Sequence, residues 1–284
     1  VHRRTFTIGV VVEYLSGSVF RNTYFGVVLD GVLEAATDHE YHVKIIRVRP
    51  NAYEKAVEHI EDGSMDGVVL ASLAADNPLA QYMVKSRVPA VMAGSVMPEV
   101  AIPYVDVDDL TAVYRGVKWL IELGHRRIGI ITGDLRKWSA RRREQGYLMA
   151  LREAGIEPLP CWRFEGDYRL EAGEEGIRHL LQADPVPTAV VCGNDRTALG
   201  VLRVLREKGI RVPDQMSVLG FDDDESAALS VPPLTTIRQP MFEIGIKATE
   251  LLLQQVEQGE RIQHSIILPT ELVVRETVAP PSLE

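Results

Sequence analysis

A chain of 284 residues is longer than one ordinary compact core and suits two domains. Its 46% hydrophobic and 25% charged residues are typical of a soluble globular protein, and no apolar run approaches the roughly 20 residues that a membrane span requires. The formal net charge of −9 argues against a broad DNA-binding surface in this segment, because phosphate affinity depends on clustered Lys and Arg.

Short apolar runs alternate along the chain with longer segments of helical period, a pattern that predicts parallel strands joined by crossover helices. In the first half each strand candidate is almost continuous in apolar residues, as expected when both faces of a sheet are covered. The predicted strands are Phe6–Val12, Val43–Val48, Gly67–Leu70 and Pro89–Met92, and the predicted helices lie near Tyr24–Asp38, Tyr53–Glu61 and Leu79–Ser86. The first half therefore predicts one open parallel sheet.

A second set of the same kind begins after Tyr104–Val107, where Asp108 is placed to cap a helix that Gly124 ends. The further strands are predicted at Ile128–Ile131, Trp162–Phe164, Ala189–Cys192 and Ser217–Phe221, with helices near Glu144–Glu153, Leu170–Leu181 and Ala198–Lys208. The last stretch is interpreted as chain that completes both lobes, with a short run at Leu234–Ile237, a helix near Glu243–Val256 and strand-like pieces at Ser265–Leu268 and Leu272–Val274. The predicted fold class is α/β with two doubly wound parallel-sheet lobes.

Residues for catalysis or cofactor binding would follow the strands, because open parallel sheets bind ligands beyond the carboxyl ends of their strands. The sequence has no Gly-x-Gly-x-x-Gly after the first strand, no phosphate-binding Gly-x-x-x-x-Gly-Lys-Ser/Thr and no Gly-x-Ser-x-Gly. His39 and His42 lack the spacing and the Glu of a zinc-protease helix. We therefore predict no enzyme, no cofactor and no metal site. The acidic run Asp222–Glu225 fits either a cation site or the start of a helix.

The most informative stretch runs from Thr132 to Tyr147 and contains three consecutive arginines, Arg141–Arg143. Arginines at a helix start oppose the helix dipole, which is unfavourable unless at least one of them binds a ligand or a carboxylate. A solvated basic surface paired with nearby acids is the alternative. The next two strands are followed by Asn194 and by Asp222. An arginine donor, the Asn194 amide, which both donates and accepts, and the Asp222 acceptor are therefore expected to face one crevice.

In these motifs the chain resembles the effector-binding core of the lactose-repressor and galactose-repressor regulators, which is related to the periplasmic sugar-binding proteins. The resemblance covers about Thr5 to Thr277. Its carriers, specific in their order and spacing, are Gly124–Gly129, Arg143–Tyr147, Pro187–Val190, Asn194-Asp195 with Ala198 and Gly200, Val212–Asp222 and Pro233–Pro240. The stretch Arg3–Gly9 is similar to the family's junction between DNA-binding headpiece and core, so an upstream helix-turn-helix headpiece is expected outside this chain.

The resemblance implies two periplasmic-binding-protein type I lobes, residues 5–107 plus 240–268 and residues 108–239 plus 269–279. They would be joined by a three-strand hinge near Val107–Asp108, Gln239–Pro240 and Leu268–Pro269. A ligand bound in the cleft would favour the closed form and so change operator affinity through the headpieces of a homodimer.

The resemblance also implies ligand-binding positions, with Arg143 and Asp222 first and Asn194 next. Tyr24, Phe25 and Tyr168 match positions that stack on the ligand, although ordinary core aromatics are the alternative. Lys137, Trp138 and Ser139 are expected in a ligand-facing loop. After Met92 this chain has Gly94-Ser95 where sugar-binding relatives often place an Asp, and the space is interpreted as room for a disaccharide or glycoside.

The predicted function is a sensor for a small polar effector, a sugar or glycoside, in a DNA-binding transcription regulator with no membrane partner. A reducing cytoplasm is the expected location, because Cys161 and Cys192 suit reduced thiols and no secretory signal precedes the first strand. The main alternative is a periplasmic sugar-binding protein of a transporter, which would share the lobes and the cleft but differ in location and oligomeric state.

Overall fold

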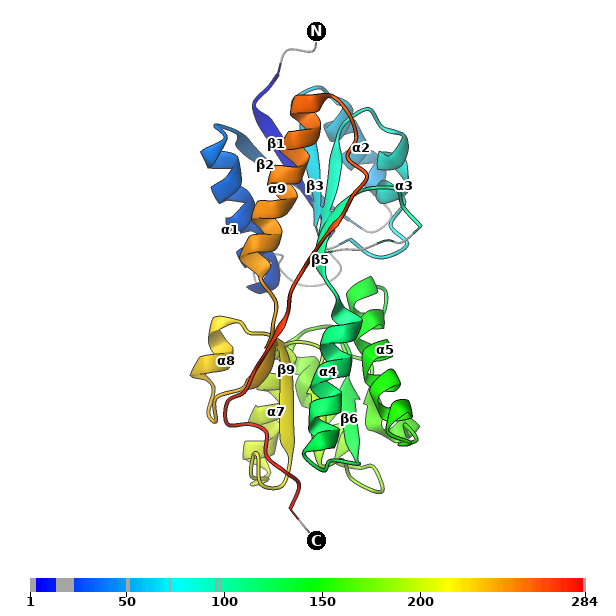
Figure 1. Cartoon of the computed structure of the whole chain (residues 1–284), viewed down its shortest axis with the longest axis vertical. Coiled ribbons are helices and arrows are strands. Elements are labelled where there is room, and N and C mark those ends of the chain that lie inside the picture. Colours follow the sequence, from blue (N-terminus) through cyan, green and yellow to red (C-terminus); the bar gives the residue numbers. More distant parts are fainter. Residues whose placement is uncertain are drawn as a thin grey trace. The chain divides into compact units, whose positions relative to one another are not determined.

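The computed structural model describes residues 4–13, 23–49, 52–71, 73–94, 97 and 99–282. The chain forms two compact units: unit 1 comprises residues up to Val107 with Pro240–Leu268, and unit 2 comprises Asp108–Gln239 with the residues from Pro269 onward. The backbone therefore passes from one unit to the other after Val107, after Gln239 and after Leu268. Each unit is a parallel or mostly parallel sheet covered by helices, so the predicted α/β class is confirmed (Figure 1).

Unit 1 is built on a sheet whose strands follow the order β11-β5-β4-β3-β1-β2, with every described pair parallel. Its elements are β1 (Thr7–Glu13), α1 (Thr23–Asp38), β2 (His42–Val48), α2 (Tyr53–Glu61), β3 (Gly67–Ala71), α3 (Pro78–Lys85), β4 (Ala90–Ala93), β5 (Tyr104–Val107), α9 (Met241–Gln258) and β11 (Ile266–Leu268). Helices α1 and α9 pack side by side against the sheet (Figure 1). Strand β5 was not predicted, because the carboxylate of Asp106 interrupts its short apolar run; the buried Asp106 Oδ1 accepts from the Val107 N–H at 2.8 Å.

Unit 2 has the sheet order β12-β10-β9-β8-β6-β7, in which only β12 runs antiparallel to its described neighbour. Its elements are α4 (Asp109–Glu122), β6 (Ile128–Ile131), α5 (Trp138–Glu153), the 3₁₀ helix Pro160–Trp162, β7 (Arg163–Phe164), α6 (Leu170–Leu180), β8 (Ala189–Cys192), α7 (Asp195–Glu207), β9 (Ser217–Asp222), α8 (Glu225–Leu229), β10 (Thr235–Arg238) and β12 (Glu271–Val273). Strand β6 pairs with the next strand in sequence, β7, on one side, and with the strand after that, β8, on its other side. The order of strands across the sheet therefore reverses at β6. Such a switch point is where open α/β sheets bind ligands.

Helix α5 begins earlier than the sequence suggests. It starts at Trp138 rather than near Glu144, so Lys137 is the N-cap and still belongs to the expected loop. Trp138 and Ser139 are helical, and the expectation of a loop is wrong for these two residues. The side chain of the N-cap residue Lys137 makes no capping hydrogen bond, so the usual Ser, Thr, Asp or Asn start signal is missing from the sequence. The arginine run accordingly lies in the helix and not at its first turn.

Helices α4 and α5 approach closely because Gly146 has no side chain. A Cβ at Gly146 would lie 2.3 Å from the Leu110 carbonyl oxygen and 3.0 Å from the Tyr114 nitrogen. The next residue, Tyr147, is buried and its hydroxyl donates to the Ile128 carbonyl at 2.7 Å, which ties α5 to β6. This packing brings the side chain of Arg143, one turn earlier on α5, against the start of α4.

We predict that Gly146→Ala destabilises the protein by about 1–3 kcal/mol, because the methyl group overlaps backbone atoms that cannot move without separating the helices. Gly26→Ala in α1 is the matched control: a Cβ there meets no described atom within 4 Å. That substitution should stabilise the protein by about 0.5–1 kcal/mol, because Ala favours a helix over Gly. Urea unfolding measures both, and equal effects of the two substitutions would contradict the packing argument.

Candidate functional site

Five of the residues predicted to bind ligand form one connected cluster in unit 2. They come from the first turns of α5 (Ser139, Arg143), the segment before α6 (Tyr168), the start of α7 (Asn194) and the end of β9 (Asp222). These are the carboxyl ends of neighbouring parallel strands and the helices that follow them, on either side of the switch point between β6 and β8.

Arg143 is the centre of this cluster and is 8% exposed. Its Nε donates to Asp109 Oδ1 and its Nη1 to the Gly193 carbonyl, both at 2.7 Å, while Nη1 lies 3.9 Å from Asp222 Oδ1. The guanidinium carbon is 3.6 Å from the ring centroid of Phe221, within the range of a cation–π contact. No described residue accepts a hydrogen bond from Nη2. The guanidinium is thus held on one edge and against one face, with donor capacity left over.

Asp222 presents the matching acceptor. Its Oδ1 accepts from Gln239 Nε2 at 2.6 Å, and among the described residues Oδ2 has no hydrogen-bond partner. The backbone of Asp222 has a φ of 117°, and that of Asp223 a φ of 58°, both in the left-handed half of conformational space that L-residues seldom adopt. Backbone strain of this kind concentrates at ligand sites, where the surrounding structure enforces it.

Contacts to its ring, its hydroxyl and its backbone carbonyl hold Tyr168 in place. The ring lies over Gly133, where a Cβ would be 2.0 Å from Cζ, and its hydroxyl is 3.2 Å from Ser139 Oγ. Asn194 Nδ2 donates to the Tyr168 carbonyl at 3.3 Å, and Asn194 Oδ1 caps α7 by accepting from the Thr197 N–H at 2.9 Å. Tyr168 also has a positive φ, 70°. Asn194 therefore both holds the backbone of Tyr168 and caps α7. Burial raises the pKa of the Tyr168 hydroxyl to about 12.

The other residues predicted to bind ligand lie at the start of α5 and on α1. Lys137 and Trp138 are half-buried at the start of α5. Phe25 is a buried residue of unit 1, as the core alternative expects, and Tyr24 lies beside it on α1. The space at Gly94 is not vacant: a Cβ there would lie 1.6 Å from the Tyr24 hydroxyl oxygen. The expectation of extra ligand room at Gly94 is therefore wrong, and Ser95 lies outside the described residues.

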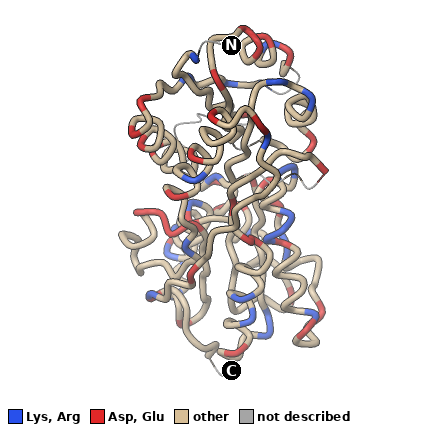
Figure 2. Tube along the Cα trace, turned by 45° about the horizontal axis from the view of Figure 1, so that its top comes forward, with Lys and Arg blue, Asp and Glu red and all other residues tan. Residues whose placement is uncertain are grey.

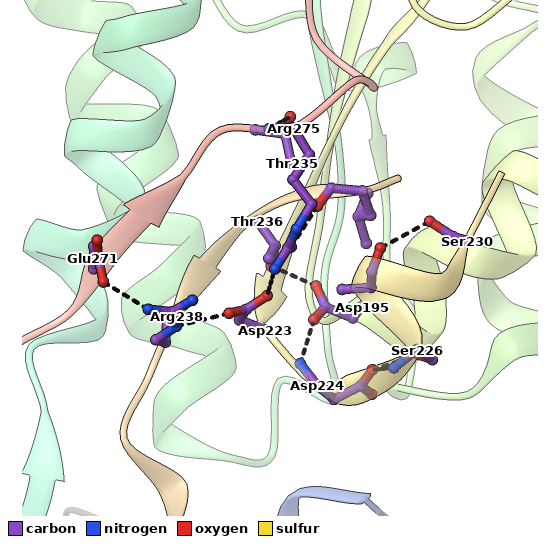
Figure 3. Close-up of polar contacts among 12 residues, drawn as sticks. Asp195, Asp223, Asp224, Ser226, Ser230, Thr235, Thr236, Arg238, Glu271 and Arg275 are labelled. Carbon is purple, nitrogen blue, oxygen red and sulfur yellow. Dashed lines mark hydrogen bonds and ion pairs between the residues drawn. The ribbon is translucent and has the colours of Figure 1, made fainter. Parts of the chain in front are cut away.

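In the acidic run that begins at the end of β9, Asp223 and Asp224 bind different partners (Figure 3). Asp223 pairs with Arg238 and Arg275, each at 2.7 Å, and Asp224 caps α8 by accepting from the Ser226 N–H at 2.9 Å. Arg238 also pairs with Glu271 at 2.9 Å. The helix-start interpretation is thus the better one. Among the described residues, no three His, Cys, Asp or Glu side chains are grouped to hold a metal ion.

Buried carboxylates outnumber buried cations around Arg143. Asp195 is completely buried, accepts from Thr236 Oγ1 at 2.5 Å and from the Asp224 N–H at 2.9 Å, and has no cation against it among the described residues. Its desolvation, together with the nearby charge of Asp222, raises the pKa of Asp195 to about 8. Desolvation raises the pKa of Asp222 to about 7, against the opposing effect of Arg143. Elsewhere acidic and basic residues are interspersed along the chain (Figure 2).

Sequence reasoning missed four contributors: Asp109, Gly133, Gln239 and Asp195 as a buried acid. Asp109 directly follows Asp108, which caps α4 as predicted by accepting from the Thr111 N–H at 3.2 Å. Two adjacent aspartates at a helix start have the same dipole explanation, so nothing local distinguishes the one that is buried. Gly133 lies two residues after the end of β6. A glycine at such a position was a signal that another group approaches the backbone closely, as the ring of Tyr168 does.

We predict that Asp195 is protonated at neutral pH and that Asp195→Asn is tolerated. A carboxyl group whose pKa is raised on folding binds its proton more tightly in the native state, so stability falls as pH rises from about 4 to about 8. The slope from this group is at most about 1.4 kcal/mol per pH unit. Unfolding free energies measured from pH 5 to 9 should fall less in Asp195→Asn than in the parent. Asp214→Asn, at an exposed aspartate, is the control. If the unfolding free energy of Asp195→Asn depends on pH as that of the parent does, the raised pKa of Asp195 is refuted.

The profile of periplasmic binding protein-like domains matches residues 117–278. The repressor CytR of Escherichia coli K12 is 37% identical over 89% of this chain and 74% of its own length. Among solved structures, a complex of the transcriptional regulator CelR with cellobiose has a TM-score of 0.90 and 32% identity, covering 97% of this chain and 85% of that one. The lac repressor dimer bound to operator and an anti-inducer has a TM-score of 0.85 and 28% identity, covering 98% and 95%.

These relatives are transcription regulators rather than enzymes, and each similarity extends over most of both chains. Within the described residues, no helix is long and apolar enough to cross a membrane. From its sequence and its fold together, the chain belongs to the LacI family of transcription regulators with a periplasmic-binding-protein-like domain.

Proposed function

We propose that this chain is the effector-binding core of a DNA-binding transcription regulator and that Arg143 and Asp222 bind hydroxyl groups of the effector. The observation that supports this is an unused donor on Arg143 and an unused acceptor on Asp222. Arg143 Nη2 has no acceptor and Asp222 Oδ2 no donor among the described residues, although the two side chains approach to 3.9 Å. Adjacent hydroxyls of a polyol offer the acceptor and the donor that these groups lack.

A carbohydrate is the effector class that we favour. The related CelR structure is a complex with cellobiose, and its fold matches nearly all of this chain. In unit 2 the ring of Tyr168 lies next to the cluster, with the guanidinium carbon of Arg143 5.9 Å from its centroid. An aromatic ring beside a few convergent polar groups is a common arrangement in small-molecule sites. Asn194, Ser139, Trp138 and Lys137 complete the proposed site from unit 2, and Tyr24 and Phe25 stay predictions from the family resemblance.

The wider assignment follows the family. We propose a homodimer that binds operator DNA through a headpiece and acts in the cytoplasm, because the lac repressor relative is a dimer on its operator. The lobe boundaries and the closure of the lobes on the effector stay predictions. We also propose that the chain catalyses no reaction on its effector, because its relatives are regulators and the cluster contains no activated nucleophile among the described residues. The comparisons do not favour the alternative of a periplasmic transport protein.

Conservative substitutions at the cluster test the proposal. A thermal-shift panel of mono- and disaccharides that includes cellobiose identifies a binding sugar, and calorimetry then measures its dissociation constant. Arg143→Lys keeps the charge beside Asp109 but removes the guanidinium fork, and Asp222→Asn keeps the shape but removes the charge. Each should weaken binding by about tenfold or more, the effect of losing one charge-assisted hydrogen bond.

Arg142→Lys is the matched control, because it makes the same chemical change at the adjacent residue, whose Nη1 donates only to Gln145 at 3.2 Å and whose Nη2 lies 3.9 Å from Asp108. Its dissociation constant should stay within about twofold of the parent, since weak exposed pairs contribute little. If Arg143→Lys and Asp222→Asn also bind like the parent, or if no polyol binds, the proposed site is wrong.

A further inference from the structure

Asp109 is a buried acid at the first position of α4, directly after its exposed neighbour Asp108. It is 4% exposed, and its Oδ1 lies 2.7 Å from Arg143 Nε. It is also only two residues beyond Val107, where the chain leaves unit 1. Asp109 is not needed to cap α4, because Asp108 already does so by accepting from the Thr111 N–H.

The distances show which carboxylate engages the guanidinium. Asp109 is in contact with Arg143, whereas Asp222 is 3.9 Å away and accepts from the amide of Gln239 instead. One guanidinium cannot neutralise several buried carboxylates at once, and its attraction falls with distance. Without Asp109, the nearest acid to Arg143 would be Asp222, and the two would form a direct ion pair.

We propose that Asp109 is a positioning residue for ligand recognition. It holds Arg143 by Nε and thereby keeps Asp222 Oδ2 free to accept from a hydroxyl group of the effector. That this arrangement of Asp109, Arg143 and Asp222 serves ligand binding rests on the proposed function. The arrangement itself is a property of the unliganded protein, so it is tested without any ligand.

The charged and titratable groups around Asp222 come from each element packed against it. They are Asp109 from α4, Arg143 from α5, Tyr168 from the segment before α6, Asp195 from α7 and Asp224 before α8. Removal of the charge of Asp109 changes this set in two ways that act in one direction on Asp222. A like charge disappears, and Arg143 becomes available to pair with Asp222.

The experiment follows the carboxyl carbon of Asp222 by ¹³C NMR as a function of pH in the ligand-free protein, with the signal assigned by its loss in Asp222→Asn. In the parent, burial places the pKa of Asp222 at about 7. In Asp109→Asn, which keeps the size of the side chain, the pKa should fall by about one unit or more. Asp108→Asn is the matched control, with the same loss of charge one residue earlier, and should leave the pKa of Asp222 within about 0.3 units of the parent.

A smaller fall in Asp109→Asn, or an equal fall in Asp108→Asn, would overturn the proposal. If Asp109→Asn does not fold, Asp109→Glu supplies the test: it keeps the charge, so the pKa of Asp222 should remain within about half a unit of the parent, and a fall of one unit would overturn the proposal. Because no effector is added, these results are independent of whether a sugar binds. A titration that behaves as expected in a protein that binds no polyol would refute the proposed function and leave the role of Asp109 toward Arg143 intact.

Discussion

The structure of unit 2 depends on one buried cation. Taking a guanidinium out of water is costly, and it is tolerated only where a carboxylate and hydrogen-bond acceptors surround it closely. Arg143 meets this condition with the carboxylate of Asp109 and the carbonyl of Gly193, at equal distances of 2.7 Å, and with the face of Phe221. These partners come from α4, from the end of β8 and from β9, so a single side chain links three segments of the unit. The guanidinium can take this place only if α4 and α5 are close, and Gly146 permits that approach.

The same arrangement leaves a surplus of buried acid. Asp195 has no cation against it among the described residues, and burial raises its pKa to about 8. Its hydrogen bonds join the start of α7 to β10 and to the start of α8. Asp222 is intermediate, since Arg143 is near it but not in contact. Three aspartates of unit 2 thus differ in role: Asp109 contacts the guanidinium, Asp222 lies 3.9 Å from it, and Asp195 binds only hydrogen-bond donors among the described residues. An effector hydroxyl that donates to Asp222 would add the partner that this carboxylate lacks.

Much of the fold could be predicted from the sequence. The runs at Ile128–Ile131 and Ala189–Cys192 are β6 and β8 with the predicted bounds, because fully covered strands are apolar throughout. The ends of helices were less predictable: α5 begins at Trp138 without a capping side chain, and α7 begins three residues before Ala198 because Asn194 is its cap. The cluster was identified through Arg143, Asn194 and Asp222, which carry polar chemistry at strand ends. Its supporting residues, Asp109 and Gln239, belong to segments distant in sequence, and only the tertiary fold brings them to the cluster.

The central claim is that Arg143 and Asp222 jointly hold the effector. A crystal structure with the binding polyol measures this directly. The account predicts one ligand hydroxyl within hydrogen-bond distance of Arg143 Nη2 and a hydroxyl donating to Asp222 Oδ2, with the contact between Arg143 and Asp109 retained. A ligand bound elsewhere, with both of these atoms still lacking a partner, would contradict it.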